Sequence, residues 1–325
     1  MGGHVASGHV ALVGPTASGK SALALELAHR RPDAELVSVD SMCVYRRMDI
    51  GTAKPSQAER AAVPYHLLDL VDPDEEFTLS RFQDLARQAL AGIEGRGRRA
   101  LLVGGTGLYL RAVVDQLSVP GRYPEVAAEL ETEADTPGGT QRLHSRLMVL
   151  DPTAAARMEP TNRRRVVRAL EVTLGAHRPF SSFGPGLDAY PPSPFRLVGI
   201  RFDPAVHDAR IEERFRVLLD AGFLDEVRAL ATRPGGLSRT ARQALGYREL
   251  LAHVEEGVPL ERSVIEAKRR TRAFARRQWA WFRRDPRITW LDPDRDLLAQ
   301  LLAVWDASGR GTRHSGAGAA DEVRD

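Results

Sequence analysis

Cysteine is almost absent from this chain of 325 residues, which holds only Cys43. An internal disulfide is therefore excluded, and a reducing compartment such as the cytoplasm fits the composition. No run of about eighteen apolar residues occurs, so we expect no membrane-spanning helix. The first eight residues lack both a basic region and an apolar stretch, so we expect no secretory signal. Nothing in the sequence indicates more than a monomer.

Lysine is also scarce, since Lys20, Lys54 and Lys268 are the only ones and arginine supplies nearly all the positive charge. Residues 1–150 hold 16 basic and 19 acidic side chains, a net charge of −3, whereas residues 151–325 hold 30 and 24, a net of +6. Genomic base composition explains the preference for arginine over lysine. It does not explain the clustering of charge, and a basic half favours a polyanionic partner.

Hydrophobic residues make up 43% of the chain and charged residues 27%, as in an ordinary globular protein, and the length favours about two domains. Helical periodicity at 20–30 and 79–93 alternates with apolar runs, which predicts an α/β fold with a parallel sheet. The predicted strands lie at 9–13, 35–39, 65–71, 99–103, 195–202 and 288–291. We expect a core of residues 9–119 and 195–305, a helical insertion at 120–194, and disordered ends at 1–8 and 306–325.

A glycine-rich loop follows the first predicted strand and opens the first helix. It matches the phosphate-loop (P-loop) pattern of a glycine, four residues and then Gly-Lys-Ser. Its residues are Gly14, Pro15, Thr16, Ala17, Ser18, Gly19, Lys20 and Ser21. Backbone N–H groups and the helix dipole suit an anion, the lysine adds a charge, and the Ser21 hydroxyl can bind Mg²⁺. The sequence therefore predicts a site for a di- or triphosphate.

Two polar residues follow other predicted strands of the same sheet. Asp40 follows 35–39 and Thr106 follows 99–103, so both lie at the carboxyl edge where parallel sheets bind ligands. NTP-hydrolysing enzymes usually place a metal-holding aspartate where this chain has Gly-Gly-Thr-Gly. Asp40 is well placed to accept a proton from a nucleophile. From these residues alone, Asp40 could equally be a helix cap or a metal ligand.

Longer motifs indicate which family of P-loop proteins the sequence resembles. DSMCVYRRMDIGTAKP at 40–55, together with GPTASGKS and LLVGGTGLYL, resembles the bacterial tRNA dimethylallyltransferase (isopentenyltransferase) family. Further similar stretches are DPTAAARM at 151–158, RRVVRALEV at 164–172, RIEERF at 210–215, QALGYRE at 243–249 and TRAFARRQWAWFR at 271–283. The resemblance covers residues 9–305 and implies a P-loop fold of the nucleotide-kinase type.

The resemblance implies transfer of a dimethylallyl group from dimethylallyl diphosphate to the exocyclic amine of the adenosine 3′ to the anticodon. It implies that Asp40 is the general base and that Thr106 binds near the amine. Arg214 would stabilise the diphosphate with Lys20, Ser21 and Mg²⁺. Because the adenine is stacked in the anticodon loop, it must flip out to react. The residues implied on the RNA side are Asp40, Ser41, Met42, Cys43, Thr106, Gln243, Ala244, Leu245, Gly246, Tyr247 and Arg248.

Two arginine clusters extend the predicted RNA surface. Residues 268–284 hold eight basic residues and no acid, and 163–168 hold a second cluster. A solvated helix face explains one such run, but two runs without a compensating acid favour phosphate contacts with the tRNA anticodon stem-loop. The arginines expected to make these contacts are Arg164, Arg165, Arg168, Arg269, Arg272 and Arg276. The stripe Ala267, Thr271, Phe274, Gln278 and Trp281 is expected to pack on the core.

Three other functions fit this sequence less well. An ATP-dependent small-molecule kinase would need an acidic metal ligand on a core strand. An enzyme that prenylates free AMP or ATP would need no helical insertion, and a non-enzymatic RNA-binding protein would need no P-loop.

Two positions depart from the family pattern. Cys43 stands where many relatives carry glutamine, and Ala127 stands near a position where relatives can place a basic RNA contact.

Overall fold

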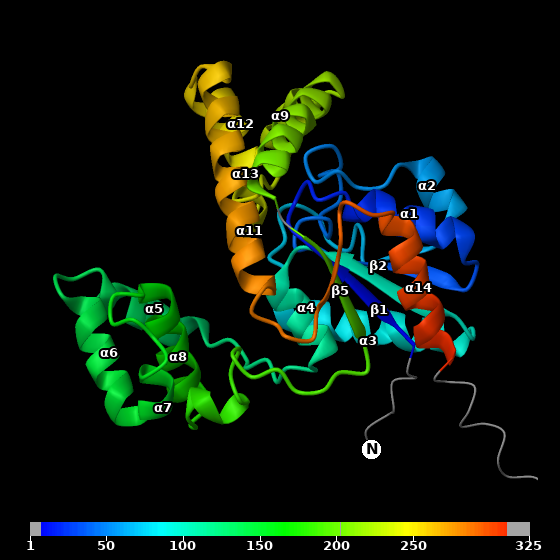
Figure 1. Cartoon of the computed structure of the whole chain (residues 1–325). Coiled ribbons are helices and arrows are strands. Elements are labelled where there is room, and N and C mark those ends of the chain that lie inside the picture. Colours follow the sequence, from blue (N-terminus) through cyan, green and yellow to red (C-terminus); the bar gives the residue numbers. More distant parts are fainter. Residues whose placement is uncertain (1–7, 202, 311–325) are drawn as a thin grey trace, which may run out of the picture. The chain divides into compact units, whose positions relative to one another are not determined.

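A computed structural model describes residues 8–201 and 203–310 (Figure 1). The described chain divides into two compact units, one of residues 116–191 and the other of the remaining residues. The predicted ends at 1–7 and 311–325 lie outside the described residues. The predicted tail at 306–325 is wrong for residues 306–310, because the last helix continues to Arg310.

A single parallel sheet organises the larger unit, in the order β3-β2-β4-β1-β5-β6. Its strands are β1 Val10–Val13, β2 Ala34–Val39, β3 Tyr65–His66, β4 Arg99–Gly104, β5 Arg196–Ile200 and β6 Thr289–Leu291. The predicted α/β class and parallel sheet are confirmed. The apolar run at 65–71 forms only two residues of strand, and Val71 instead makes an isolated bridge with Tyr45.

Helices cover both faces of this sheet, α1 Lys20–Arg30 and α14 Leu297–Arg310 on one face and α3 Leu79–Gly95 and α4 Gly107–Val114 on the other. The larger unit also contains α2 Gln57–Ala62, α9 Pro204–Asp220, α10 Phe223–Ala231, α11 Arg239–Arg242, α12 Tyr247–Glu256 and α13 Leu260–Phe282. Alternate strand residues point to opposite faces. Those at Val10 and Leu12 pack with α1 and α14, whereas those at Ala11 and Val13 pack with α3 and α4 (Figure 1).

The smaller unit is helical, with a core of its own. It contains α5 Pro124–Ala134, α6 Gly139–Leu150, α7 Pro152–Ala155, α8 Arg163–Gly175 and the 3-10 helix η1 Phe180–Phe183. Leu130, Leu143, Leu147, Val166 and Leu170 are almost fully buried among themselves. The insertion therefore folds around its own apolar cluster. Among residues 8–201 and 203–310, every helix is too short or too polar to cross a lipid bilayer.

We expect Gly104→Ala to destabilise the protein by about 1–3 kcal/mol, the usual cost of overpacking. A Cβ atom at Gly104 would lie 2.0 Å from the carbonyl oxygen of Val39 in the neighbouring strand. Gly95→Ala is the matched control, since a Cβ atom there meets nothing within 4 Å. Urea unfolding measures both variants. Equal midpoints for the two would contradict the close approach of β2 and β4.

Candidate active site

Three segments that follow parallel strands meet at one edge of the sheet. The register pairs Val13 and Val39 with Gly104, so the P-loop after β1, Asp40 after β2 and Thr106 after β4 leave the sheet together. The carboxyl edge of a parallel sheet is the usual ligand site. The structure therefore brings together the three segments that the sequence predicted to form the site.

The P-loop has the backbone of an anion site. Ala17 and Gly19 both have left-handed φ angles, of 61° and 87°. No side chain caps the start of α1, so its first N–H groups are available to an anion. The Ser18 hydroxyl is buried in the loop and has no hydrogen-bond partner among the described residues. A phosphate oxygen would satisfy these donors.

Two cations lie beside the loop. Burial lowers the pKa of Lys20 to about 8, and the charge of Asp40 partly opposes this shift. Burial also lowers the pKa of the Arg214 guanidinium, again opposed by Asp40. Lys20 donates only to the Pro15 carbonyl oxygen, 3.1 Å away, and Arg214 has no ion-pair partner in the part of the chain described. The two cations repel each other, and an anion between them would relieve this repulsion.

Asp40 is held by its own loop. One of its carboxylate oxygens accepts hydrogen bonds from the backbone N–H groups of Met42 at 2.8 Å and Cys43 at 3.3 Å. The neighbouring Ser41 N–H donates to the Thr106 hydroxyl oxygen at 3.3 Å. Asp40 and Thr106 are therefore joined through one residue, and the other carboxylate oxygen of Asp40 is left for a ligand.

Cys43 does not face outward. It is 8% exposed, its sulfur lies 3.9 Å from the Thr52 carbonyl oxygen, and burial raises the pKa of its thiol. The predicted RNA-lining stretch at 40–43 therefore offers Ser41 and Met42, which are partly exposed, rather than the cysteine.

The second predicted RNA-lining stretch, at 243–248, is divided in the same way. Gln243 and Arg248 are exposed, and Leu245 is partly exposed. The other three, Ala244, Gly246 and Tyr247, are buried and pack among core residues. In this structure the surface of the stretch is therefore formed by Gln243, Leu245 and Arg248.

Sequence reasoning missed Glu226, which joins residues 49–51 to Tyr247. Its carboxylate accepts hydrogen bonds from the backbone N–H groups of Asp49 at 2.8 Å, Ile50 at 2.7 Å and Gly51 at 3.2 Å. It also accepts the hydroxyl hydrogen of Tyr247, with an O···O distance of 2.6 Å. One carboxylate on α10 thus fixes the loop after Asp40 to the start of α12. No sequence signal distinguishes it from other surface glutamates.

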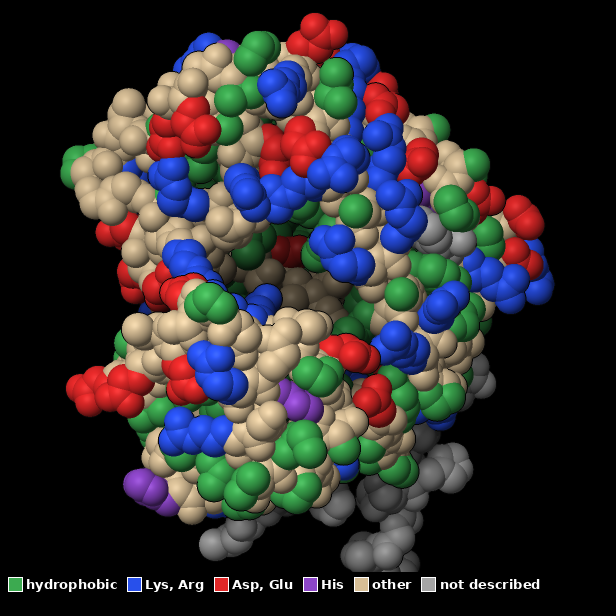
Figure 2. Space-filling model, turned by 90° about the vertical axis from the view of Figure 1, so that its left-hand side faces the viewer, with side chains coloured by type: hydrophobic (Ala, Val, Ile, Leu, Met, Phe, Trp, Pro, Cys, Tyr) green, Lys and Arg blue, Asp and Glu red, His purple; other side chains and the backbone are tan. Residues whose placement is uncertain are grey.

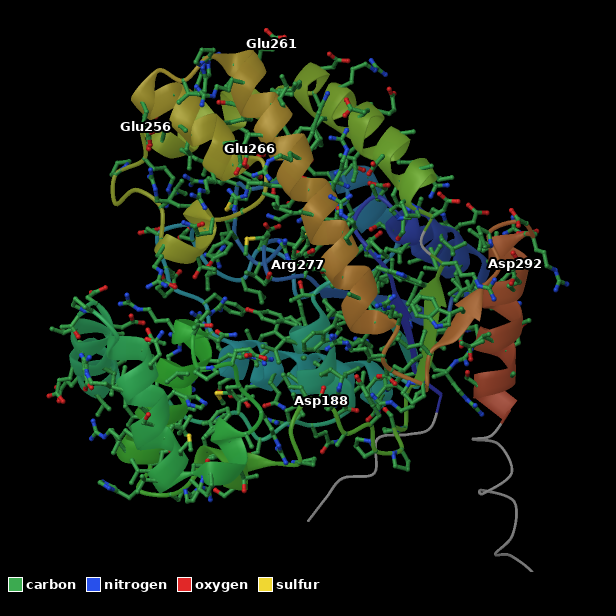
Figure 3. The ribbon with its side chains drawn as sticks, turned by 60° about the vertical axis from the view of Figure 1, so that its left-hand side comes forward. Asp188, Glu256, Glu261, Glu266, Arg277 and Asp292 are labelled. Atoms are coloured by element: carbon green, nitrogen blue, oxygen red, sulfur yellow. The ribbon has the colours of Figure 1, made fainter. Side chains whose placement is uncertain are left out.

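Acidic side chains neutralise part of the predicted arginine row on α13, although the sequence alone predicted no compensating acid there. Arg269 pairs with Glu266 at 2.6 Å, and Arg272 pairs with Glu212 of α9. The expectation of a run without compensating acid is therefore wrong for these two arginines. Arg276 is exposed and has no ion pair within the described residues. Figure 3 shows Glu261, Glu266 and Arg277 in this order along α13, from its acidic start to its basic end.

The packed face of α13 also differs by one position from the prediction. Ala267, Thr271 and Gln278 are buried as expected. Ser263, Ala275 and Phe282 are buried as well. Trp281 is partly buried and packs against the core as predicted, whereas at Phe274 the buried position is its neighbour Ala275. The 3.6-residue period admits either neighbour, and the side chain that fits against the core decides.

The predicted cluster in the insertion is divided too. Arg164 and Arg165 are exposed and unpaired in the part of the chain described. Arg168 instead pairs with Glu171 at 2.7 Å and donates to the carbonyl oxygens of Pro120 and Gly121. Figure 2 likewise shows Lys and Arg side chains (blue) interleaved with Asp and Glu (red) over the face in view. Only some of the arginine side chains are therefore available to bind a polyanion.

Comparison with known proteins gives a consistent result. Residues 43–285 match the IPP transferase family. The tRNA dimethylallyltransferase of Roseiflexus castenholzii is 47% identical over 300 residues, which are 91% of this chain and 96% of that protein. The enzyme of the same name from Bifidobacterium animalis is 42% identical over 307 residues, which are 93% of this chain and 88% of that protein.

Solved structures agree with the sequence comparison. The tRNA isopentenylpyrophosphate transferase of Bacillus halodurans has a TM-score of 0.66 and 36% identity, covering 95% of this chain and 100% of that one. A eukaryotic dimethylallyltransferase described as acting on tRNA has a TM-score of 0.72 and 27% identity, covering 94% of this chain and 78% of that one.

The pKa of Lys20 generates a prediction for diphosphate binding. Lys20 loses its charge as the pH rises through about 8, so the affinity for inorganic diphosphate should fall between pH 7 and 9. Lys20→Arg is the matched control, because its guanidinium stays charged over this range. At pH 9 the wild-type affinity, relative to pH 7, should drop about tenfold more than that of the variant.

Isothermal titration calorimetry at several pH values measures this difference. The ionisation of diphosphate itself affects both proteins equally and cancels in the ratio. Parallel pH curves for the two proteins would show that the Lys20 ammonium does not contact the anion.

Proposed function

The chain belongs to the IPP transferase family, and on that premise we propose that it transfers a dimethylallyl group from dimethylallyl diphosphate to tRNA. The acceptor is the exocyclic amine of the adenosine 3′ to the anticodon. The products are N6-(dimethylallyl)adenosine and diphosphate, an early step of tRNA hypermodification. The activity belongs in the cytoplasm, and action as a monomer stays a prediction.

One observation carries the proposal. An anion loop lies beside two cations that form no ion pair among the described residues, Lys20 and Arg214. The same sheet edge carries Asp40, of which one carboxylate oxygen accepts no hydrogen bond from the described chain. A kinase would need an acidic metal ligand after β4, where this chain has Gly104, Gly105 and Thr106. The arrangement suits a reaction in which diphosphate leaves intact and an amine loses a proton.

In the proposed reaction the adenine nitrogen attacks the first carbon of the dimethylallyl group, and the bond from that carbon to the diphosphate oxygen breaks. The leaving diphosphate takes both electrons of that bond and remains with Lys20 and Arg214. The proton of the amine passes to Asp40. Because an aromatic amine is a very weak acid, the proton leaves late, after the new C–N bond forms. Stabilisation of the leaving group and positioning therefore supply most of the rate enhancement.

Mg²⁺ would bind at this site together with the diphosphate and not as an ion held by the protein alone. Among the described residues no group of three or more His, Cys, Asp or Glu side chains could hold a metal. Mg²⁺ commonly takes one or two protein ligands and completes its shell with phosphate oxygens and water. The Ser21 hydroxyl at the start of α1 would be its protein ligand. When bound, the ion neutralises part of the diphosphate charge.

The direct test uses dimethylallyl diphosphate labelled in the prenyl group. We expect label in unmodified tRNA, in a single nucleoside next to the anticodon, and none in AMP or ATP. Label in free nucleotides would favour the nucleotide prenyltransferase, and transfer of phosphate from ATP to a small molecule would favour a kinase. Binding of tRNA without any transfer would favour a non-enzymatic RNA-binding protein.

Asp40→Asn should reduce the single-turnover transfer rate by about 10²–10⁴-fold, as is typical for loss of a general base. Asparagine keeps the size and one oxygen for the Met42 and Cys43 N–H groups, so fold and substrate binding should be retained. Asp225→Asn, an exposed position on α10, serves as the control. A rate within a few-fold of wild type would leave Asp40 as a loop-forming residue only.

Exposed arginines near the end of α13 and just after it should dominate tRNA binding. In Arg276→Gln/Arg283→Gln/Arg284→Gln, three exposed arginines without ion pairs in the described chain are removed. The slope of log affinity against log salt should decrease by about two to three. Filter binding at several salt concentrations gives this slope.

The matched control removes three cations that are already paired, in Lys268→Gln/Arg269→Gln/Arg272→Gln. Its slope should change by less than about one, because these side chains are held by acids of the protein. Equal changes in the two triple variants would mean that the ion pairs open on binding. If neither triple variant changes the slope, the RNA would bind elsewhere, and Arg164 and Arg165 would be the arginines to test next.

A further inference from the structure

Gln278 of α13 spans two parts of the donor site. Its side-chain oxygen accepts a hydrogen bond from the Thr16 N–H of the P-loop at 2.8 Å. Its side-chain nitrogen donates to the Gly105 carbonyl oxygen at 2.8 Å. The side chain is 7% exposed, so these bonds are largely shielded from water. Gln278 thus connects the loop that would hold diphosphate with the segment that carries Thr106.

Few side chains could make both contacts. The site needs an acceptor for an N–H group and a donor for a carbonyl oxygen at the end of a three-carbon side chain. Glutamate would offer no donor, lysine no acceptor, and asparagine is one carbon shorter. Glutamine therefore suits this position by its chemistry and not only by its volume.

Glycines let α13 come this close. A Cβ atom at Gly105 would lie 2.3 Å from the Gln278 side-chain nitrogen, and one at Gly107 would lie 2.2 Å from the Trp281 indole nitrogen. Ala17 of the P-loop packs against a cluster that includes Ala267 and Ala275 of α13. One helix therefore packs against both the tip of the P-loop and the end of β4.

The opposite face of the same helix is the proposed tRNA surface. Arg276 is exposed and lies two positions before Gln278, and Arg283 and Arg284 follow at the end of the helix. The helix runs unbroken from Leu260 to Phe282. A shift of α13 on binding RNA would therefore move Gln278 together with the arginines.

We propose that Gln278 is a positioning residue that couples tRNA binding on α13 to the affinity of the P-loop for diphosphate. The inference rests on the proposed function, since it assumes that α13 binds tRNA. Its contacts predict reciprocal coupling, in which RNA tightens diphosphate binding and diphosphate tightens RNA binding by the same factor. The two substrates would then assemble cooperatively on one helix.

The test measures the affinity for inorganic diphosphate with and without a saturating anticodon stem-loop RNA. In the wild-type protein we expect RNA to tighten diphosphate binding about fivefold or more. In Gln278→Met, which keeps the volume but makes neither hydrogen bond, diphosphate alone should bind about tenfold more weakly. The ratio of affinities with and without RNA should fall to about one, while RNA alone binds as in wild type.

Thr271→Val is the matched control on the same buried face. Its hydroxyl donates only within the helix, to the Ala267 carbonyl oxygen at 2.8 Å. The variant should retain the wild-type coupling. Loss of coupling in Thr271→Val as well would mean that any disturbance of α13 has this effect, and would overturn the specific role of Gln278. Wild-type coupling in Gln278→Met would overturn it too.

Gly105→Ala tests the same contact from its other side and covers the case in which Gln278→Met fails to fold. The added methyl group would displace the Gln278 side chain, so we expect the same loss of coupling. The double variant Gly105→Ala/Gln278→Met should be no weaker in diphosphate binding than the weaker single variant, because both changes break one contact. Additive losses would indicate that the two positions act separately.

Failure of this inference can be told apart from failure of the proposed function. Prenyl transfer to tRNA by the wild-type protein tests the function without reference to Gln278. A protein that transfers the group but shows no effect of RNA on diphosphate affinity keeps the function and loses the coupling. A protein that binds diphosphate through Gln278 but makes no prenylated tRNA loses the function alone.

Discussion

The close contact between α13 and the Gly-Gly-Thr-Gly segment after β4 is the constraint on which the site depends. Parallel strands bring the P-loop, Asp40 and Thr106 to one edge, but the sheet alone does not fix how the loops lie above it. Gln278 and Trp281 reach these loops only because Gly105 and Gly107 have no side chains. Gly104 meets the same requirement within the sheet, against Val39. The glycines of this segment are thus required for close packing, and Thr106 is the residue in it that can contact a substrate.

Local sequence signals predicted the sheet and the P-loop well. The P-loop pattern, five of the six strands and the helix at 20–30 lie where periodicity and turn residues put them. The run at 65–71 looked like a long strand because it is apolar. Only two of its residues pair with β2, since Leu67 and Asp69 adopt left-handed φ angles that end the extended backbone. The tail looked disordered because it is small and polar, although residues 306–310 extend α14.

Contacts between distant parts of the chain were beyond local reasoning. Arg272 finds Glu212 sixty residues away, so an apparently bare arginine row became partly neutral. Glu226 binds the loop 177 residues before it, and Gln278 binds a P-loop residue 262 positions away. Charge and polarity reveal that such side chains need partners, but only the fold decides which partners they meet. The division between free and paired arginines therefore had to come from the structure.

The most direct test of this account is a structure of the protein with inorganic diphosphate and an anticodon stem-loop bound together. We expect diphosphate in the P-loop between Lys20 and Arg214. The adenine 3′ to the anticodon should be flipped out, with its exocyclic nitrogen within about 3.2 Å of an Asp40 carboxylate oxygen. An adenine that stays stacked in its loop, or a diphosphate bound away from the P-loop, would contradict the account.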